Sequence, residues 1–240
     1  MLVLQCQECA GFYHQTNGLA SGAGEYHCLP FPNSPDDAQA ALSGFDRDEQ
    51  NRLKQEAFYK VGTRFFNKKG YAGTSLDEIA EHLKVSKGAF YYHIKSKDEL
   101  LLACYERSLA ISERIHEQIN NTSISGIEKL EQVCRRGFHI QNSEDGPIIR
   151  YNTITALPIE RRKSVLKRNA ELSKSFQQII DAGIEDGSIR PVNSFVAENL
   201  ISGASNAAMD IKLWRRIDDV DTAGIEYFDV LLNGLKPRSS

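Results

Sequence analysis

Residues 75–94 constrain the fold of this 240-residue chain more than any other stretch, because they have the pattern of two short helices joined by a tight turn. Ser75 and Glu78 have the spacing of a capping box, which starts a helix, and Ser86 is placed to cap the second helix. In the first helix, apolar residues recur at intervals of three or four and form one face, with Leu76, Ile79, Ala80 and Leu83. Two short helices connected in this way are typical of a helix-turn-helix, whose second helix enters the major groove of DNA.

The segments on either side of this motif narrow the class of protein. They read RFFNKKGYAGT over residues 64–74 and KSKDEL over residues 95–100. Together with the motif they resemble the DNA-binding domain of the TetR family of bacterial transcriptional regulators, over about residues 50–108. Two positions depart from the family pattern. Lys84 replaces the usual glycine at a turn position that favours positive φ, and Ile94 replaces the usual phenylalanine in the core.

The resemblance implies which residues contact DNA. Positions for base contact or close backbone approach are occupied by Lys87, Gly88, Ala89 and Tyr92. Positions for phosphate contact are occupied by Thr74, Ser86, Tyr91, His93 and Lys97, and Ser75 completes the predicted DNA-binding set. For Tyr91 an alternative stays open, in which the ring packs and its hydroxyl is bonded inside the domain.

Charge and composition agree with a DNA-binding protein of the cytoplasm. Residues 47–108 hold 12 Lys and Arg against 9 Asp and Glu, whereas the whole chain has a net charge of −3. No stretch approaches the ~18 apolar residues of a membrane span, so no membrane partner is expected. The N-terminus has no basic segment ahead of an apolar run, which is atypical of a secreted protein. Five scattered cysteines do not form a disulfide framework.

The first 46 residues are unlike the rest, because they contain prolines and many small residues but no Lys or Arg. We expect a poorly ordered extension over 1–46. One alternative is a zinc site formed by Cys6, Cys9, His27 and Cys28, although the spacing matches no zinc module. Another alternative is that the stretch is the tail of a lost first half of a tandem TetR-type regulator.

The remaining chain has helical periodicity and no run of period two, so we expect an all-α protein. An N-terminal three-helix helix-turn-helix domain (47–108) would be followed by a C-terminal helical ligand-binding and dimerisation domain (109–240). The apolar repeat that begins at Leu53 predicts a first helix over 48–67, and a long fourth helix runs to about residue 120. The helix expected over 194–214 has small residues on one face, Gly203, Ala204, Ala207 and Ala208. The resemblance favours pairing of this helix with a second subunit, and the alternative is an intramolecular core helix.

The resemblance also implies an effector pocket in the C-terminal domain. Candidate lining residues are the aromatic or polar groups on otherwise apolar faces, Phe138, His139, Tyr151, Phe176 and Trp214. The alternative for each is ordinary core packing. The chain has no nucleophile-elbow, P-loop, zinc-protease or dinucleotide-binding motif, so we expect no enzyme, no cofactor and no metal.

We therefore expect a regulator that binds a palindromic DNA operator as a homodimer and responds to a small-molecule effector that the sequence does not identify. A repressor is the favoured form. The alternative is an interaction protein with the helix-turn-helix fold, or a truncated half of a tandem regulator, that no longer reads an operator. The acidic extension favours the alternative, and the intact contact set from Ser86 to Lys97 favours the regulator.

Overall fold

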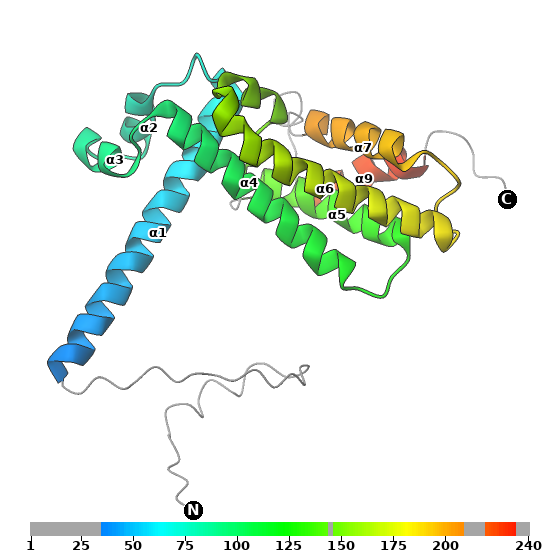
Figure 1. Ribbon diagram of the computed structural model, residues 1–240, viewed down its shortest axis with the longest axis horizontal. Helices are drawn as coiled ribbons and strands as arrows, with labels where there is room; N and C mark the ends of the chain where they lie inside the picture. The colour runs from blue at the N-terminus through cyan, green and yellow to red at the C-terminus, as the bar shows by residue number, and fades with distance from the viewer. Residues whose placement is uncertain (1–34, 144–145, 209–218, 234–240) are drawn as a thin grey trace, which may run out of the picture. The chain divides into compact units, whose positions relative to one another are not determined.

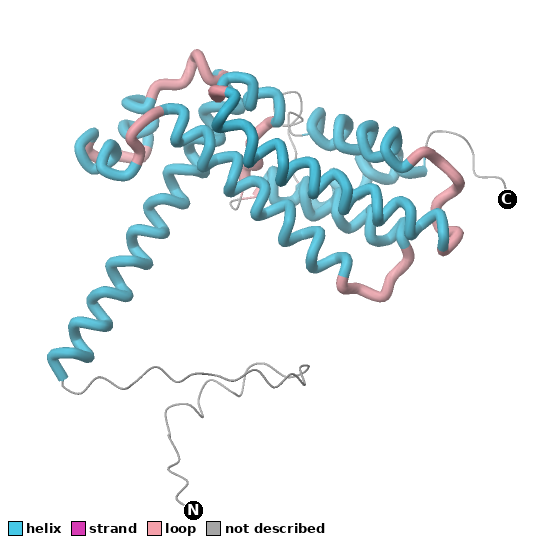
Figure 2. The backbone as a smooth tube through the Cα atoms, viewed as in Figure 1, coloured by secondary structure: helices cyan, strands magenta, loops and turns pink. Residues whose placement is uncertain are grey.

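The computed structural model describes residues 35–143, 146–208 and 219–233, and for residues 35–46, 220 and 221 it describes the backbone alone. Over these residues the chain forms helices and connecting loops without strands, so the predicted all-α class is confirmed (Figure 2). The chain divides into two compact units, residues 1–47 and 48–240. The elements in chain order (Figure 1) are α1 (Pro35–Lys69), α2 (Leu76–His82), α3 (Lys87–His93), α4 (Lys97–Asn120), α5 (Gly126–Asn142), the 3₁₀ helix η2 (Tyr151–Ala156), α6 (Ile159–Glu185), α7 (Ser194–Ala208) and α9 (Val220–Asn233).

The first helix starts earlier than the sequence predicted. α1 begins at Pro35 rather than at residue 48, so residues 35–46 of the expected disordered extension are helical. A proline is well tolerated in the first turn, and the two acidic residues after it suit the positive end of the helix dipole. Leu53, predicted to face the core, is 55% exposed, because the part of α1 that packs begins near Phe58. Residues 1–34, including Cys6, Cys9, His27 and Cys28, lie outside the described part of the chain.

One hydrophobic core holds α1, α2, α3 and the start of α4 together. Phe66, Ile79 and Phe90 are almost fully buried in it. Ile94 is 1% exposed, so this replacement of the family's phenylalanine still fills the core. Tyr71 is half-buried, and its ring stacks on that of Phe66 with centroids 6.2 Å apart. We call this part of the chain, residues 47–108, the reader domain.

The caps of the reader helices differ from the predicted ones in one case. Ser86 caps α3 as expected, because its hydroxyl accepts a hydrogen bond of 3.2 Å from the Ala89 amide. The prediction of a capping box at Ser75 and Glu78 is wrong, since the Ser75 side chain makes no capping hydrogen bond. The Glu78 carboxylate lies instead 2.7 Å from the ammonium of Lys69, at the end of α1. A lysine brought close by the fold competes successfully for this carboxylate.

The turn between α2 and α3 has the predicted backbone conformation. Lys84 adopts φ 55°, in the region where glycine is favoured. Gly70, which ends α1, has φ 69° as its place at the helix end requires. The tight turn of the helix-turn-helix therefore contains a side chain where glycine would be less strained.

A second core lies among the C-terminal helices. Ile119, Leu130, Ile180 and Phe228 are at most 3% exposed within it. α4 belongs to both cores, because Leu100 and Leu101 pack in the first and Ile115 and Ile119 in the second. The predicted domain boundary at residues 108 and 109 therefore lies inside one continuous helix.

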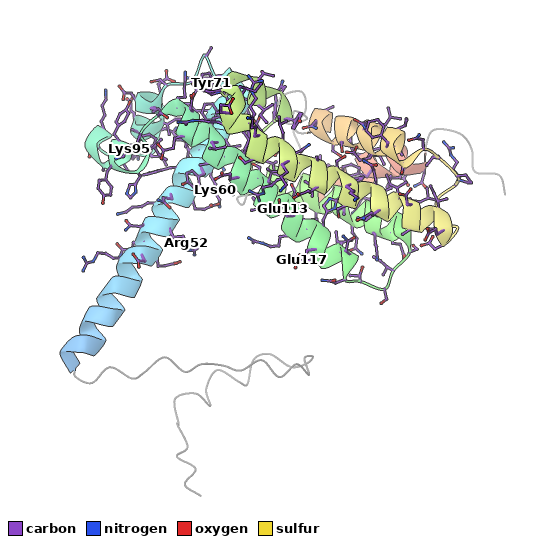
Figure 3. All side chains as sticks on the ribbon, viewed as in Figure 1. Arg52, Lys60, Tyr71, Lys95, Glu113 and Glu117 are labelled. Carbon is purple, nitrogen blue, oxygen red and sulfur yellow. The ribbon has the colours of Figure 1, made fainter. Side chains whose placement is uncertain are left out.

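Specific contacts fix α4 and α5 against α6. The Arg168 guanidinium of α6 makes two bonds of 2.6 and 2.9 Å to the Glu113 carboxylate of α4 (Figure 3). At the start of α5, Gly126 lies so close to Gly183, near the end of α6, that a Cβ on Gly126 would be 2.2 Å from the Gly183 Cα. Only a residue without a side chain fits at this crossing.

Candidate DNA-binding interface and C-terminal cavity

The helix α3 presents most of the predicted base-contact residues on one exposed face. Phe90 is fully buried and holds the helix to the core, while Lys87, Gly88 and Ala89 are exposed at its N-terminal end. Tyr92 is 74% exposed, which is unusual for a tyrosine that only packs. This arrangement gives α3 a free surface suited to the edges of bases in a groove.

Lys87 and Tyr91 both bond to Asp77 of α2. The Lys87 ammonium lies 2.6 Å from the Asp77 carboxylate, and the Tyr91 hydroxyl donates to the other carboxylate oxygen at 3.1 Å. The bond from Lys87 lowers the pKa of Asp77 below its usual value and raises that of Lys87. Tyr91 thus has its hydroxyl bonded inside the domain, as the alternative required, although its ring is 39% exposed rather than packed.

Lys95 is a basic residue of this surface that the sequence reasoning missed. Lys95 is labelled in Figure 3, just after the C-terminal end of α3. Its ammonium donates hydrogen bonds to two carbonyls of that helix, those of Tyr91 at 3.0 Å and Tyr92 at 2.7 Å. It also lies 5.4 Å from the centroid of the Tyr92 ring. A lysine directly after a short helix was the available signal, because cations favour the carbonyl end of a helix.

Three of the predicted phosphate-contact residues are less accessible than expected. Thr74 is buried, and its hydroxyl donates to the Gly70 carbonyl at 2.7 Å, so it is not presented to a phosphate in this conformation. His93 is half-buried against Phe58, with ring centroids 5.7 Å apart. Lys97 is also half-buried, because its ammonium donates to the Thr74 carbonyl at 3.1 Å. Ser75 and Ser86 are exposed.

Tyr71 supports the position of Lys97. The Lys97 ammonium lies 4.3 Å from the centroid of the Tyr71 ring, a cation–π contact. The Tyr71 hydroxyl donates to Asp98, the next residue of α4 (Figure 3). Burial and this hydrogen bond raise the pKa of Tyr71 to about 12. The first turn of α4 is thereby fixed relative to the end of α1.

The C-terminal helices form a partly open cavity of about 530 Å³, which we call the C-terminal cavity. It is lined by residues of α4, α5, α6, α7 and α9 and by Ile148, Ile149 and Tyr151, where the chain enters η2. Phe138, Tyr151 and Phe176 line it, as three of the five predicted pocket residues. His139 is exposed and does not line it, because it lies about 100° around α5 from Phe138. Trp214 lies outside the described residues.

Two ionisable side chains in the cavity wall were not predicted. His116 of α4 is 6% exposed, and its Nδ1 lies 3.3 Å from the Ser175 hydroxyl. Burial lowers the pKa of His116 to about 4. Glu198 of α7 is 8% exposed, and its carboxylate accepts a bond of 2.9 Å from the Ser202 hydroxyl. The signal for Glu198 was its spacing of three residues from Ile201, which places a charge on the inward face of the helix.

No described helix is long and apolar enough to cross a membrane. Among residues 35–143, 146–208 and 219–233, no three metal-binding side chains come together.

Comparison with known proteins covers both parts of the chain. Residues 58–104 match the profile of the bacterial regulatory proteins of the tetR family, and residues 123–210 match that of the tetracyclin repressor-like C-terminal domain. The transposon Tn10 TetC protein of Escherichia coli is 30% identical over 147 residues, which are 58% of this chain and 69% of TetC. The chain belongs to the TetR family of transcriptional regulators. Its reader domain is thus the family's DNA-binding domain.

Two further comparisons with this TetR-family chain differ in how much of the chain they cover. The uncharacterised regulator YerO of Bacillus subtilis is 48% identical over 59 residues, which are 25% of this chain and 20% of YerO. The structure of AibR, solved with isovaleryl coenzyme A and operator DNA, has a TM-score of 0.61 and covers 75% of this chain and 98% of AibR. At 21% identity the AibR likeness establishes the fold alone. The identity with YerO is therefore limited to 59 residues, whereas the likeness in fold to AibR covers 75% of this chain.

Proposed function

We propose that this TetR-family protein is a ligand-responsive transcriptional repressor that binds a palindromic operator as a homodimer. The observation that carries the proposal is that one helix, α4, belongs to the core behind the exposed α3 and also lines the C-terminal cavity. Repression is supported by the match of residues 123–210 to a repressor-like domain. AibR, a protein of the same fold, was solved with a small molecule and operator DNA together.

DNA reading would divide between base and phosphate contacts. Lys87, Ala89 and Tyr92 lie on the exposed face of α3, where the second helix of such a motif meets base edges. Lys95 and the exposed hydroxyls of Ser75 and Ser86 lie beside them and would contact phosphates. Such contacts with phosphates fix orientation, while the α3 side chains select the sequence.

Dimerisation would use the exposed apolar side chains of α7 and α9. The Tyr227 hydroxyl of α9 donates to the Ala204 carbonyl of α7 at 2.7 Å, which holds the two helices side by side. The large apolar residues left exposed on them outside the cavity lining are Val196, Leu200, Ile225 and Val230. Gly203 and Ala207 are exposed beside these residues, whereas Ala208 is buried. Apolar side chains gathered on paired helices favour a subunit interface.

Effector response would travel from the cavity wall to the reader domain by two routes. The first is α4, which lines the cavity and continues into the reader core. The second is the segment 148–151, which also lines the cavity and is bonded to α1. The Asn67 side chain donates to the Ile148 carbonyl at 2.8 Å and accepts from the Arg150 amide at 2.9 Å. A ligand that shifts either element would change the spacing of the two readers in a dimer.

Footprinting of the DNA upstream of the protein's own gene tests the proposal, together with sedimentation of free protein and complex. We expect protection of two half-sites about 34 Å apart, or a multiple of this spacing, by a dimer. The other candidate is an interaction protein that does not read an operator, and it is favoured by the neutralisation of Lys87 by Asp77. A monomer that shifts no duplex at low salt would support that candidate and reject ours.

A further inference from the structure

The wall of the C-terminal cavity has an unbalanced charge. Among the described residues that line it, Glu198 is the only carboxylate and none is a lysine or arginine. His116 is the one basic side chain there, and because burial lowers its pKa to about 4, it is uncharged near neutral pH. Burial raises the pKa of Tyr105 and of Cys134, two further titratable groups of the wall, so both are uncharged at that pH as well.

The Glu198 side chain is buried and has a single hydrogen-bonded side-chain partner among the described residues. It is 8% exposed, and among the described residues it forms no ion pair. The one side chain of the described residues seen to donate to it is Ser202, at 2.9 Å. A carboxylate can accept about four hydrogen bonds, and a buried one costs free energy unless a cation or several donors face it. The Glu198 carboxylate is therefore suited to accept a hydrogen bond or an ion pair from a ligand bound in the cavity.

The other lining residues are consistent with an apolar body attached to one positive charge. Aromatic residues from five helices line the cavity, namely Tyr105, Phe138, Phe176, Phe195 and Phe228. Such rings bury apolar surface and also attract cations over their faces. The uncharged polar groups come mainly from serine and asparagine side chains. A cavity of about 530 Å³ is within the range of pockets for small organic molecules.

We infer that the effector is an organic monocation, an ammonium or amine with an apolar or aromatic body, and that Glu198 is its counter-charge. The inference rests on the proposed function, since it assumes that the cavity binds an effector. It also sets this chain apart from AibR, whose solved ligand is a coenzyme A thioester. The phosphates of such a ligand would meet no lysine or arginine among the described residues of this wall.

The test is a set of three probes that differ in charge but share a shape. They are a phenylalkyl trimethylammonium ion, its uncharged analogue with tert-butyl in place of trimethylammonium, and a phenylalkyl carboxylate of equal length. Calorimetric titration into the full chain should show the ammonium ion binding most tightly. Glu198→Gln should weaken it by roughly tenfold or more, as loss of a buried charge pair does, and should leave the uncharged analogue unaffected. Glu185→Gln, at the exposed end of α6, is the matched control.

Several results would overturn the inference. They are equal binding of the ammonium ion and its uncharged analogue, tighter binding of the carboxylate, or binding by none of the three. Retained binding of the uncharged analogue shows that Glu198→Gln is folded, and Ser202→Ala gives a second variant with a milder loss. Release of operator DNA separates this inference from the proposed function. If the ammonium ion binds through Glu198 but leaves the DNA complex intact, the charge assignment stands and the ligand-responsive function fails. If another probe alone releases the DNA, the function stands and the assignment fails.

Discussion

The ammonium of Lys87 lies 2.6 Å from a carboxylate oxygen of Asp77, so the cation expected to read bases is bound by an acid on the neighbouring helix. Tyr91 bonds to the same carboxylate at 3.1 Å. Both partners are exposed, and an exposed ion pair is worth little stability. Its consequence is for DNA binding, because Lys87 must leave or share Asp77 to reach a base.

Asp77→Asn should release Lys87 and Tyr91 and remove a negative charge from the DNA-facing surface. We expect tighter binding to unrelated duplex and a smaller difference between operator and unrelated DNA. Lys87→Ala should instead cost ~1–3 kcal/mol on the operator with little effect on unrelated DNA. Fluorescence anisotropy titrations of both duplexes at several salt concentrations measure these changes. Glu81→Gln, an exposed change on the same helix, is the control, and equal behaviour of the two acid variants would show that the bond to Lys87 has no role.

Lys84→Gly should stabilise the protein, because Lys84 occupies φ 55°. The left-handed conformation costs a side-chain-bearing residue ~1–2 kcal/mol, and part of this gain is offset by the freedom of glycine in the unfolded chain. We expect a net increase of about 0.5–1 kcal/mol in the free energy of unfolding, measured by urea titration. Lys84→Ala removes the same charge but keeps the strain, so a similar gain in that variant would contradict the explanation.

His116 should make the protein less stable as the pH falls from 6.5 towards 4. Burial lowers its pKa from 6.5 to about 4, so within this window the unfolded chain binds a proton that the folded chain does not. The full free energy of unfolding is present above pH 6.5. The loss due to His116 at low pH is about 3 kcal/mol at most, at ~1.4 kcal/mol per pH unit. Thermal and urea melts at several pH values should show a shallower decline for His116→Gln than for the wild type. His139→Gln, at an exposed site on α5, should follow the wild type.

Leu200→Glu should convert the proposed homodimer to a monomer. Leu200 is 67% exposed on α7, and a charge there would have to be desolvated in an apolar interface. Leu166→Glu places the same charge at a 40% exposed site on α6 and is the matched control. Sedimentation velocity at micromolar concentration distinguishes the two, and operator affinity should fall only for Leu200→Glu. Dimers in both variants would reject α7 as the interface.

Local patterns in the sequence predicted the reader domain well because its determinants lie close together in the chain. Ser86 caps α3 as its place before the helix implied, and Lys84 and Ile94 have the backbone conformation and the burial that the family resemblance implied. The capping box at Ser75 was wrong because the partner of Glu78 is Lys69, whose approach depends on the fold. The predicted start of α1 was wrong because the helix-forming residues after Pro35 outweigh the glycine among them.

The C-terminal cavity was less predictable because its walls come from helices far apart in the chain. Aromatic character identified Phe138, Tyr151 and Phe176, but it gave no means of separating His139, which is exposed, from them. Glu198 and His116 were missed because a polar residue on a helix is ordinarily solvated. Their burial results from packing of α4 and α7 against α6, which no local pattern records.

Because α4 contributes Leu100 and Leu101 to one core and Ile115 and Ile119 to the other, the two functional halves cannot be exchanged between relatives at their nominal border. A hybrid joined at residue 108 would set a foreign half-helix against native partners on both sides of the seam. Recombination that keeps the whole of α4 with either parent still mismatches one core. New pairings of DNA specificity and effector are therefore expected to arise by substitution within each half rather than by shuffling of halves.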